Sequence, residues 1–256
     1  MHKGKMMNIL ITGANGFLGK NLIERLVKIP NVNIMHYSKG TSKLLLEKNL
    51  AECDFLFHFA AVHRPKDTKE FYKVNDDFFE EILNTLKKNG NACPVLFTSS
   101  IQANDSTDYG RSKSIAEKLL KKHASETGAR AIIYRLNNTF GKWATPNHHS
   151  VVATFCYNIN RDLPIAISSR DVVMRFYYID DVIDHFIAQL SEQVKADDDG
   201  IFRLKEEQIV SITLGELADK LYVFREIQKS GEIPKFETLL DKRLWSTYLS
   251  YADAEN

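Results

Sequence analysis

A glycine-rich turn joins a short apolar segment to an amphipathic one near the start of the chain, and this feature constrains the fold most. Residues 8–12 (NILIT) have the composition of a buried strand, and residues 17–29 have the apolar spacing of a helix. Between them, Gly13, Gly16 and Gly19 are spaced three residues apart. Glycine allows a sharp turn and close approach to a pyrophosphate, whose charge is attracted by the N–H groups that open the helix. This context predicts a βαβ dinucleotide-binding unit.

Apolar segments alternate with helical patterns through the first half of the sequence. Strands are expected at residues 32–37, 54–60, 94–99 and 129–136, and helices at residues 68–88 and 109–127. Such alternation is typical of parallel strands joined by helical crossovers. We therefore predict an α/β fold with a doubly wound, Rossmann-type parallel sheet.

The alternation loosens after Gly141, which predicts a second structural region. We expect residues 1–141 to form mainly the dinucleotide-binding Rossmann core and residues 142–256 mainly a smaller C-terminal substrate-binding lobe, with segments near 168–190 returning to the core. In the second half, helices are expected at residues 150–161, 180–192, 214–228 and 236–249, and strands at residues 165–167 and 172–179. We expect the lobe to cover the carboxyl edge of the sheet, where ligands bind in such folds.

Composition excludes several classes of partner. The net charge of +1 argues against general nucleic-acid binding, which needs a basic surplus. No apolar run is long enough to span a bilayer, so no membrane partner is expected. The three cysteines are odd in number and show no Cys-x-x-Cys spacing, which favours reduced thiols in a cytoplasmic protein.

A tyrosine and a lysine four residues apart carry the strongest chemical signal. Tyr109 and Lys113 are one helical turn apart, and Ser100 ends an apolar strand just upstream. We expect the Lys113 ammonium to lower the pKa of Tyr109 from about 10 towards neutrality. Ser100 would hold a substrate carbonyl at the sheet edge, and Tyr109 would donate a proton to it. With the glycine loop, the three residues predict nicotinamide-dependent chemistry on a carbonyl or alcohol.

The end of the second expected strand bears on the choice of cofactor. An acidic residue at this place would hydrogen-bond the ribose 2′-hydroxyl of NAD. Residues 36–40 (HYSKG) contain no acid, and Ser38 and Lys39 are suited to a 2′-phosphate. A solvated loop lysine is an equally ordinary role for Lys39. We predict NADPH/NADP+ as the cofactor, with NADH less favoured.

Taken in order, these motifs resemble the extended short-chain dehydrogenase/reductase family, most of whose members modify nucleotide sugars. The match comprises the glycine loop, His58-Phe59-Ala60-Ala61, Asn75, Thr98-Ser99-Ser100, Tyr109-x-x-x-Lys113, Tyr134-Arg135-Leu136 with Phe140-Gly141, and Asp180-Asp181. The resemblance implies that Ser100, Tyr109 and Lys113 are catalytic. It implies cofactor contacts from Gly13, Gly16, Phe17, Leu18, Gly19, Ser38, Lys39, Ala60, Ala61, Tyr109 and Lys113.

The sequence is more closely similar to one subgroup of this family, the reductase domains of capsular-polysaccharide enzymes. The similarity is carried by residues 99–103, 140–143, 146–147, 150–157 and 246–251. It implies NADPH-dependent reduction of the 4-keto group of a UDP-2-acetamido-2,6-dideoxyhexos-4-ulose to a UDP-6-deoxy-talosamine-type sugar, in capsule or O-antigen precursor synthesis. It also implies a homodimer. The expected substrate contacts are His63, Gln102, Asn138, Asn147 and Ser150.

Departures from the subgroup leave alternatives open. The subgroup carries a C-terminal cupin domain that epimerises the sugar, whereas this sequence ends at Asn256. We therefore expect a separate cupin-type epimerase, or a domain outside this sequence, to set the ring stereochemistry. A 4-epimerase or dehydratase of the same family is an alternative, although Ile101-Gln102 stand where a dehydratase usually has two acids. A non-enzymatic dinucleotide sensor is another, although such sensors often lose the Tyr or Lys. No metal is expected, because neither Cys nor an acidic cluster accompanies His148-His149.

Overall fold

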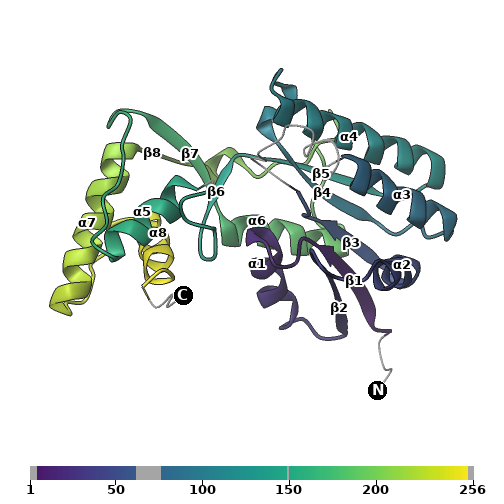
Figure 1. Cartoon of the computed structure of the whole chain (residues 1–256), viewed down its shortest axis with the longest axis horizontal. Helices are drawn as coiled ribbons and strands as arrows, with labels where there is room; N and C mark the ends of the chain where they lie inside the picture. The colour runs from purple at the N-terminus through teal and green to yellow at the C-terminus, as the bar shows by residue number, and fades with distance from the viewer. Residues whose placement is uncertain (1–4, 62–75, 149, 253–256) are drawn as a thin grey trace. The chain divides into compact units, whose positions relative to one another are not determined.

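The computed structural model describes residues 5–61, 76–148 and 150–252, and the chain divides into two compact units (Figure 1). The first unit comprises Met1–Leu136 and His185–Arg203, and the second comprises Asn137–Asp184 and Leu204–Asn256. Each unit has its own sheet and its own buried aromatic side chains.

The first unit is built on a five-stranded parallel sheet of order β2-β1-β3-β4-β5. The strands are β1 (Met7–Thr12), β2 (Val32–Tyr37), β3 (Phe55–His58), β4 (Val95–Ser100) and β5 (Ala131–Leu136). Every pair in this sheet is parallel, and the chain reverses its direction of winding between β1 and β3. Phe202 adds a parallel bridge to Tyr134 at the β5 edge. The predicted doubly wound α/β fold is confirmed.

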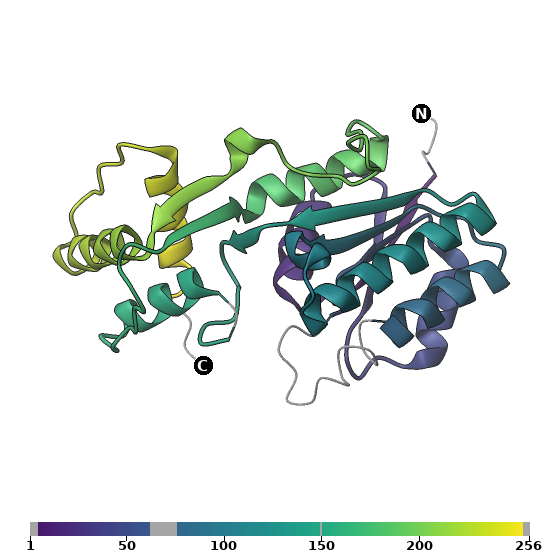
Figure 2. The ribbon, with the colours of Figure 1, turned by 90° about the horizontal axis from the view of Figure 1, so that it is seen from above.

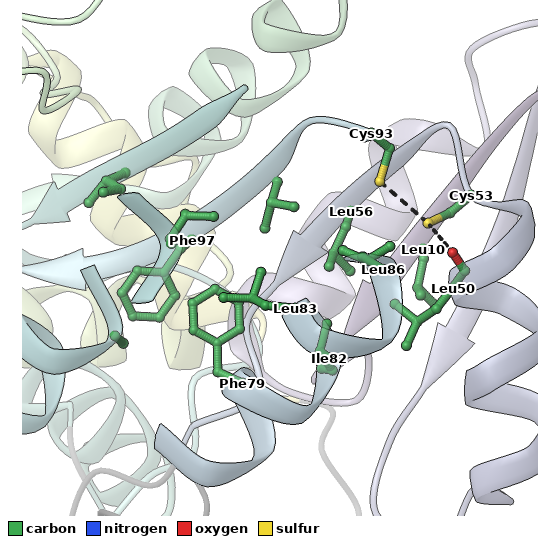
Figure 3. Packing of buried hydrophobic residues seen from close by; sticks show 14 of the residues in the cluster. Leu10, Leu50, Cys53, Leu56, Phe79, Ile82, Leu83, Leu86, Cys93 and Phe97 are labelled. Carbon is green, nitrogen blue, oxygen red and sulfur yellow. Dashed lines mark hydrogen bonds between the residues drawn. The ribbon is translucent and has the colours of Figure 1, made fainter. Parts of the chain in front are cut away.

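Helices cover both faces of this sheet. They are α1 (Phe17–Leu26), α2 (Lys43–Glu52), α3 (Phe78–Lys88) and α4 (Asp108–Thr127), with α6 (Ile179–Ala188) linking the two units along the chain. Figure 2 shows α2, α3 and α4 together on one face and α1 on the other. The face under α2–α4 is a continuous apolar core that includes Leu10, Leu56 and Phe97 (Figure 3). At one end of this core the Cys53 and Cys93 sulfurs lie 3.6 Å apart as free thiols.

The second unit has a three-stranded sheet of order β6-β7-β8. Its strands are β6 (Asn138–Phe140), β7 (Val173–Tyr178) and β8 (Val210–Thr213), and its other helices are α5 (Val151–Asn160), α7 (Leu214–Ser230) and α8 (Leu239–Leu249). An edge-to-face aromatic contact joins α7 to α8, because the ring centroids of Phe224 and Trp245 lie 5.2 Å apart with the ring planes at 77°. The Tyr251 hydroxyl donates to the Ala144 carbonyl at 2.7 Å and so fastens the C-terminal end of the described chain to the loop after β6.

The strand predicted at residues 165–167 is wrong. These residues lie in an irregular segment after Pro164, and the neighbours of β7 are β6 and β8. The side chains of this segment alternate between exposed and partly buried, as they would in an edge strand. No neighbouring strand pairs with the segment, however, so it does not form one. The helix predicted at residues 68–88 is described only from Phe78 onwards. In the part of the chain that the structure describes, no helix combines the length and apolarity that a membrane span requires.

Candidate active site

The glycine loop packs tightly against the ends of two neighbouring strands. Gly13 has a left-handed φ of 72°, and its N–H donates to the Tyr37 carbonyl at 2.9 Å. A Cβ at Gly13 would come within 2.7 Å of the Ala60 nitrogen, and one at Gly19 within 2.5 Å of the Gly13 oxygen. Helix α1 then begins without a side-chain cap at Gly16 and without an acid in its first turn. This cradle and the uncapped N–H groups fit a dinucleotide pyrophosphate.

The other predicted cofactor residues lie around the same sheet edge. Phe17 and Leu18 form the first turn of α1. Ala60 and Ala61 follow β3, and all four residues are partly exposed. Ser38 and Lys39 follow β2, where the Ser38 N–H donates to the Thr41 hydroxyl at 3.2 Å and Lys39 is exposed. Because the carboxyl ends of parallel strands share one edge, these residues surround the glycine loop.

Ser100 and Tyr109 meet through a short turn and a capped helix. Ser100 ends β4, and its Oγ accepts the Gln102 N–H at 3.2 Å at the start of the 3-10 helix Ile101–Asn104. Thr107 caps α4, with its hydroxyl accepting the Gly110 N–H at 3.0 Å. The Tyr109 side chain is thereby brought into a hydrogen bond with the Ser100 side chain.

Lys113 is buried behind this pair. Its side chain comes from the second turn of α4, and the residue is only 3% exposed. The ammonium donates to the Thr98 carbonyl at 2.9 Å and lies 4.8 Å from the Phe97 ring centroid and 5.8 Å from that of Tyr109. Burial lowers the pKa of Lys113 to about 8, against the opposing charges of Asp76 and Glu117.

The expectation that the pKa of Tyr109 lies towards neutrality is wrong for this structure. Burial raises the pKa of Tyr109 to about 12, and only the hydrogen bond with Ser100 opposes the rise. The Lys113 ammonium is instead held by the Thr98 carbonyl. The phenol therefore keeps its proton at neutral pH, which is the state that a proton donor requires.

A buried ion pair between Glu117 and Arg135 lies next to the site, and the sequence analysis did not identify Glu117. Glu117 follows Lys113 by one turn of α4, and its side chain is 6% exposed. It accepts two hydrogen bonds from Arg135, at 2.8 and 2.7 Å, and one from the Ser99 hydroxyl at 2.6 Å. This network ties α4 to the ends of β4 and β5. The signal for it was the four-residue spacing from Lys113 to Glu117 on one helix face.

Gly110 was also missed, although it stands between the predicted residues Tyr109 and Lys113. A Cβ on Gly110 would lie 2.2 Å from the Gln102 carbonyl oxygen and 2.8 Å from that of Asp105. The absence of a side chain lets the first turn of α4 lie against the 3-10 helix. This close approach keeps Tyr109 next to Ser100.

The predicted substrate residues divide between the two units. Gln102 is an exposed residue of the first unit. In the second unit, Asn138 is exposed on β6, and Asn147 has a left-handed φ of 55° and donates its N–H to the Thr154 hydroxyl at 2.9 Å. Ser150 caps α5, because its hydroxyl accepts the Ala153 N–H at 3.2 Å. The substrate roles of these residues stay predictions.

Three predicted positions lie outside the described residues. His63 and Asn75 fall between residues 61 and 76, and His149 is the gap between residues 148 and 150. Within the described ranges, no group of three or more His, Cys, Asp or Glu side chains is placed to hold a metal ion.

Comparison with known proteins extends these observations. Residues 9–204 match the NAD dependent epimerase/dehydratase family. The chain is 38% identical, over 245 residues, to the UDP-2-acetamido-2,6-beta-L-arabino-hexul-4-ose reductase of Pseudomonas aeruginosa. That match covers 96% of this chain and 65% of the reductase, so the chain spans just under two thirds of its relative's length.

Solved structures agree with the sequence relatives. The capsular polysaccharide assembling protein CapF from Staphylococcus aureus superposes with a TM-score of 0.85 and 38% identity, covering 98% of this chain and 68% of CapF. The UDP-glucuronic acid 4-epimerase from Bacillus cereus, in complex with NAD, has a TM-score of 0.78 at 17% identity and shares the fold over 96% of this chain and 98% of its own. The chain therefore belongs to the NAD dependent epimerase/dehydratase family, the extended short-chain dehydrogenases/reductases that its motifs resemble.

Proposed function

We propose that this chain uses NADPH to reduce the 4-keto group of a UDP-2-acetamido-2,6-dideoxyhexos-4-ulose to a UDP-6-deoxy-talosamine-type sugar. The proposal rests on the hydrogen-bonded Ser100–Tyr109 pair, with Lys113 behind it, at the sheet edge that also carries the glycine loop. The relative from Pseudomonas aeruginosa, named as a 4-ulose reductase, supports the choice of substrate.

The chemistry follows from the state of each side chain. NADPH, when bound, supplies the hydride that reduces the carbonyl carbon. The Ser100 hydroxyl donates a hydrogen bond to the carbonyl oxygen as negative charge develops on it. Tyr109, with its pKa raised to about 12 by burial, stays protonated until that oxygen becomes an alkoxide and takes the proton. The buried Lys113 ammonium then stabilises the phenolate that remains.

The overall reaction can be tested with purified protein. We expect NADPH oxidation on addition of a UDP-4-keto-6-deoxy-N-acetylhexosamine of the correct ring configuration, with one equivalent of 4-hydroxy sugar seen by NMR. UDP-glucose and UDP-N-acetylglucosamine serve as controls without a keto group and should cause no oxidation. Absence of turnover with every 4-keto epimer would contradict the proposed function.

Cofactor choice is a separate prediction, motivated by Ser38 and the exposed Lys39 at the end of β2. We expect NADP+ to bind more tightly than NAD+ in calorimetric titration. Lys39→Ala should weaken NADP+ binding by about tenfold, because a charge-assisted hydrogen bond is worth about 1.5 kcal/mol, and should leave NAD+ binding unchanged. Lys48→Ala, at another exposed lysine, is the control. Equal affinity for the two cofactors would reject the preference.

Gly110 gives a prediction about geometry. Gly110→Ala should lower kcat by about 10²-fold, because a displacement of about 1 Å between the 3-10 helix and α4 separates Ser100 from Tyr109. Steady-state kinetics and the thermal midpoint are measured together. Arg111→Ala, at the exposed neighbouring position, should keep full activity. Wild-type kcat in Gly110→Ala would show that the close contact is not needed.

The remaining proposals concern surroundings and partners. We propose that a cupin-type epimerase sets the ring stereochemistry of the sugar before it is reduced, since the named relative acts on an L-arabino-configured 4-ulose. We also propose a homodimer that works in the cytoplasm. The unlinked Cys53 and Cys93 thiols, 3.6 Å apart, are compatible with that reducing compartment. Size-exclusion chromatography with light scattering tests the dimer.

A further inference from the structure

Asp76 is a buried carboxylate that the chemistry above does not use. It lies just before α3 and is 6% exposed, and neither of its carboxylate oxygens has a hydrogen-bond partner among the described residues. The next residue, Asp77, is exposed. Burying an unpaired carboxylate costs free energy, so the nearby charges decide whether this carboxyl group is protonated.

Two packed aromatic rings connect the start of α3, next to Asp76, with Lys113 on α4. Phe79 follows Asp76 by three residues, about one helical turn. Its ring lies 5.1 Å from that of Phe97, centroid to centroid, and Phe97 holds the Lys113 ammonium 4.8 Å from its own centroid. Asp76 thus lies about one turn before a ring that packs on Phe97, the ring over which the Lys113 ammonium lies. Each acts on the other: Asp76 raises the pKa of Lys113, and Lys113 lowers that of Asp76.

Of the two carboxylates that act on Lys113 among the described residues, Asp76 is the one that is not also paired with an arginine. Glu117 also raises the pKa of Lys113, but its carboxylate is shared with Arg135. His58 stacks on Phe79 at 4.2 Å, and burial holds its pKa at about 3, so it is neutral in the working range. Tyr109 keeps its proton, as described above.

Asp76 itself titrates close to neutrality. Burial, reinforced by the neighbouring Asp77 charge, raises the pKa of Asp76 to about 7, and the Lys113 charge opposes this rise. Asp76 therefore becomes negative just below the pH at which Lys113, with a pKa of about 8, loses its proton. The Asp76 carboxylate is therefore negatively charged in the pH range where Lys113 begins to lose its proton.

We propose that Asp76 is a positioning residue that keeps Lys113 protonated during the reduction, so that positive charge stands behind the Tyr109 phenolate. The catalytic part of this proposal rests on the proposed function, whereas the effect of Asp76 on Lys113 does not. Burial favours the neutral amine, and Asp76 offsets that penalty through charge.

Three variants test this proposal: Asp76→Asn, Asp77→Asn as the exposed control, and Asp76→Glu as the conservative replacement. In Asp76→Asn, the alkaline limb of the kcat/KM profile for ketosugar reduction should move about one pH unit lower. At pH 8 this shift predicts a loss of about fivefold, because the protonated fraction of Lys113 falls from about a half to about a tenth. Asp77→Asn and Asp76→Glu should keep the limb within about 0.3 unit of wild type.

A second readout is independent of substrate and cofactor. In protein labelled with ¹³C at lysine Cε, the Lys113 resonance, assigned by its loss in Lys113→Arg, should titrate about one unit lower in Asp76→Asn than in Asp77→Asn. Asp76→Ser, with a smaller side chain, repeats the comparison if Asp76→Asn does not fold. Coincident Lys113 titrations in the Asp76 and Asp77 variants would overturn the proposal. If the Lys113 titration moves in Asp76→Asn as predicted but the wild-type protein reduces no ketosugar, the result would instead count against the proposed function.

Discussion

Replacing Tyr109 by Phe will lower kcat for ketosugar reduction by about 10³-fold, within the range that a general acid contributes, while NADP+ affinity changes by less than about twofold. The phenyl ring keeps its packing in α4 near the Lys113 ammonium. The variant lacks the hydroxyl that hydrogen-bonds Ser100 and gives the proton to the sugar oxygen. Steady-state kinetics and cofactor titration on the same preparation separate the two effects.

Tyr222→Phe is the matched control, because that side chain is exposed on α7. It should leave both kcat and cofactor affinity at wild-type values. If Tyr109→Phe retains as much as a tenth of wild-type kcat, a barrier change of about 1.4 kcal/mol or less, then Tyr109 is not the proton donor.

Removing Arg135 will have the largest effect on stability. Arg135→Ala should lower the free energy of unfolding by about 3–5 kcal/mol, because it leaves the buried Glu117 carboxylate without its counter-ion. The Ser99 hydroxyl alone then remains as its hydrogen-bond donor from this network. Urea unfolding of the intact chain, followed by circular dichroism, measures the loss.

Arg170→Ala provides the comparison for an exposed pair. Its partner Asp219 is solvent-accessible, and the variant should cost less than about 1 kcal/mol. Adding Glu117→Gln to Arg135→Ala should restore part of the lost stability, since the buried charge is then gone. An Arg135→Ala variant no less stable than Arg170→Ala would show that the ion pair does not support the site.

Helices and strands of the Rossmann unit were predictable where a regular spacing of apolar residues was bounded by residues that end a helix or strand. β2 begins and ends at the predicted residues, and α4 begins within one residue of the expected Tyr109. Helix α2 was missed because its apolar residues do not form one stripe: Leu46 is buried whereas Leu44 is 75% exposed. Short strands were missed for a different reason. β6 is three residues long and begins with Asn138, so its existence depends on pairing with β7.

The candidate site could be predicted as a set of residues but not as an electrostatic arrangement. Ser100, Tyr109 and Lys113 were found from their order and spacing together with the glycine loop, and the structure brings them together in one unit. Spacing does not report burial, which raises the pKa of Tyr109 and lowers that of Lys113. Asp76 was missed because its relation to Lys113 arises from the packing of α3 against α4, and Glu117 because its ion pair with Arg135 joins α4 to β5.

Tracing the hydride tests the central claim most directly. The chain is incubated in deuterated water with NADPH and the UDP-4-keto-6-deoxy sugar in its reducible configuration, and then in ordinary water with NADPH deuterated at nicotinamide C4. In the first reaction we predict no carbon-bound deuterium at C3 or C5 of the sugar, and in the second, with the deuterium on the transferred face, one deuterium at C4. Deuterium at C3 or C5 from solvent, with this chain as the sole enzyme, would contradict the account of a reductase alone and indicate an enzyme that removes a proton next to the ketone, such as a 3- or 5-epimerase or a dehydratase.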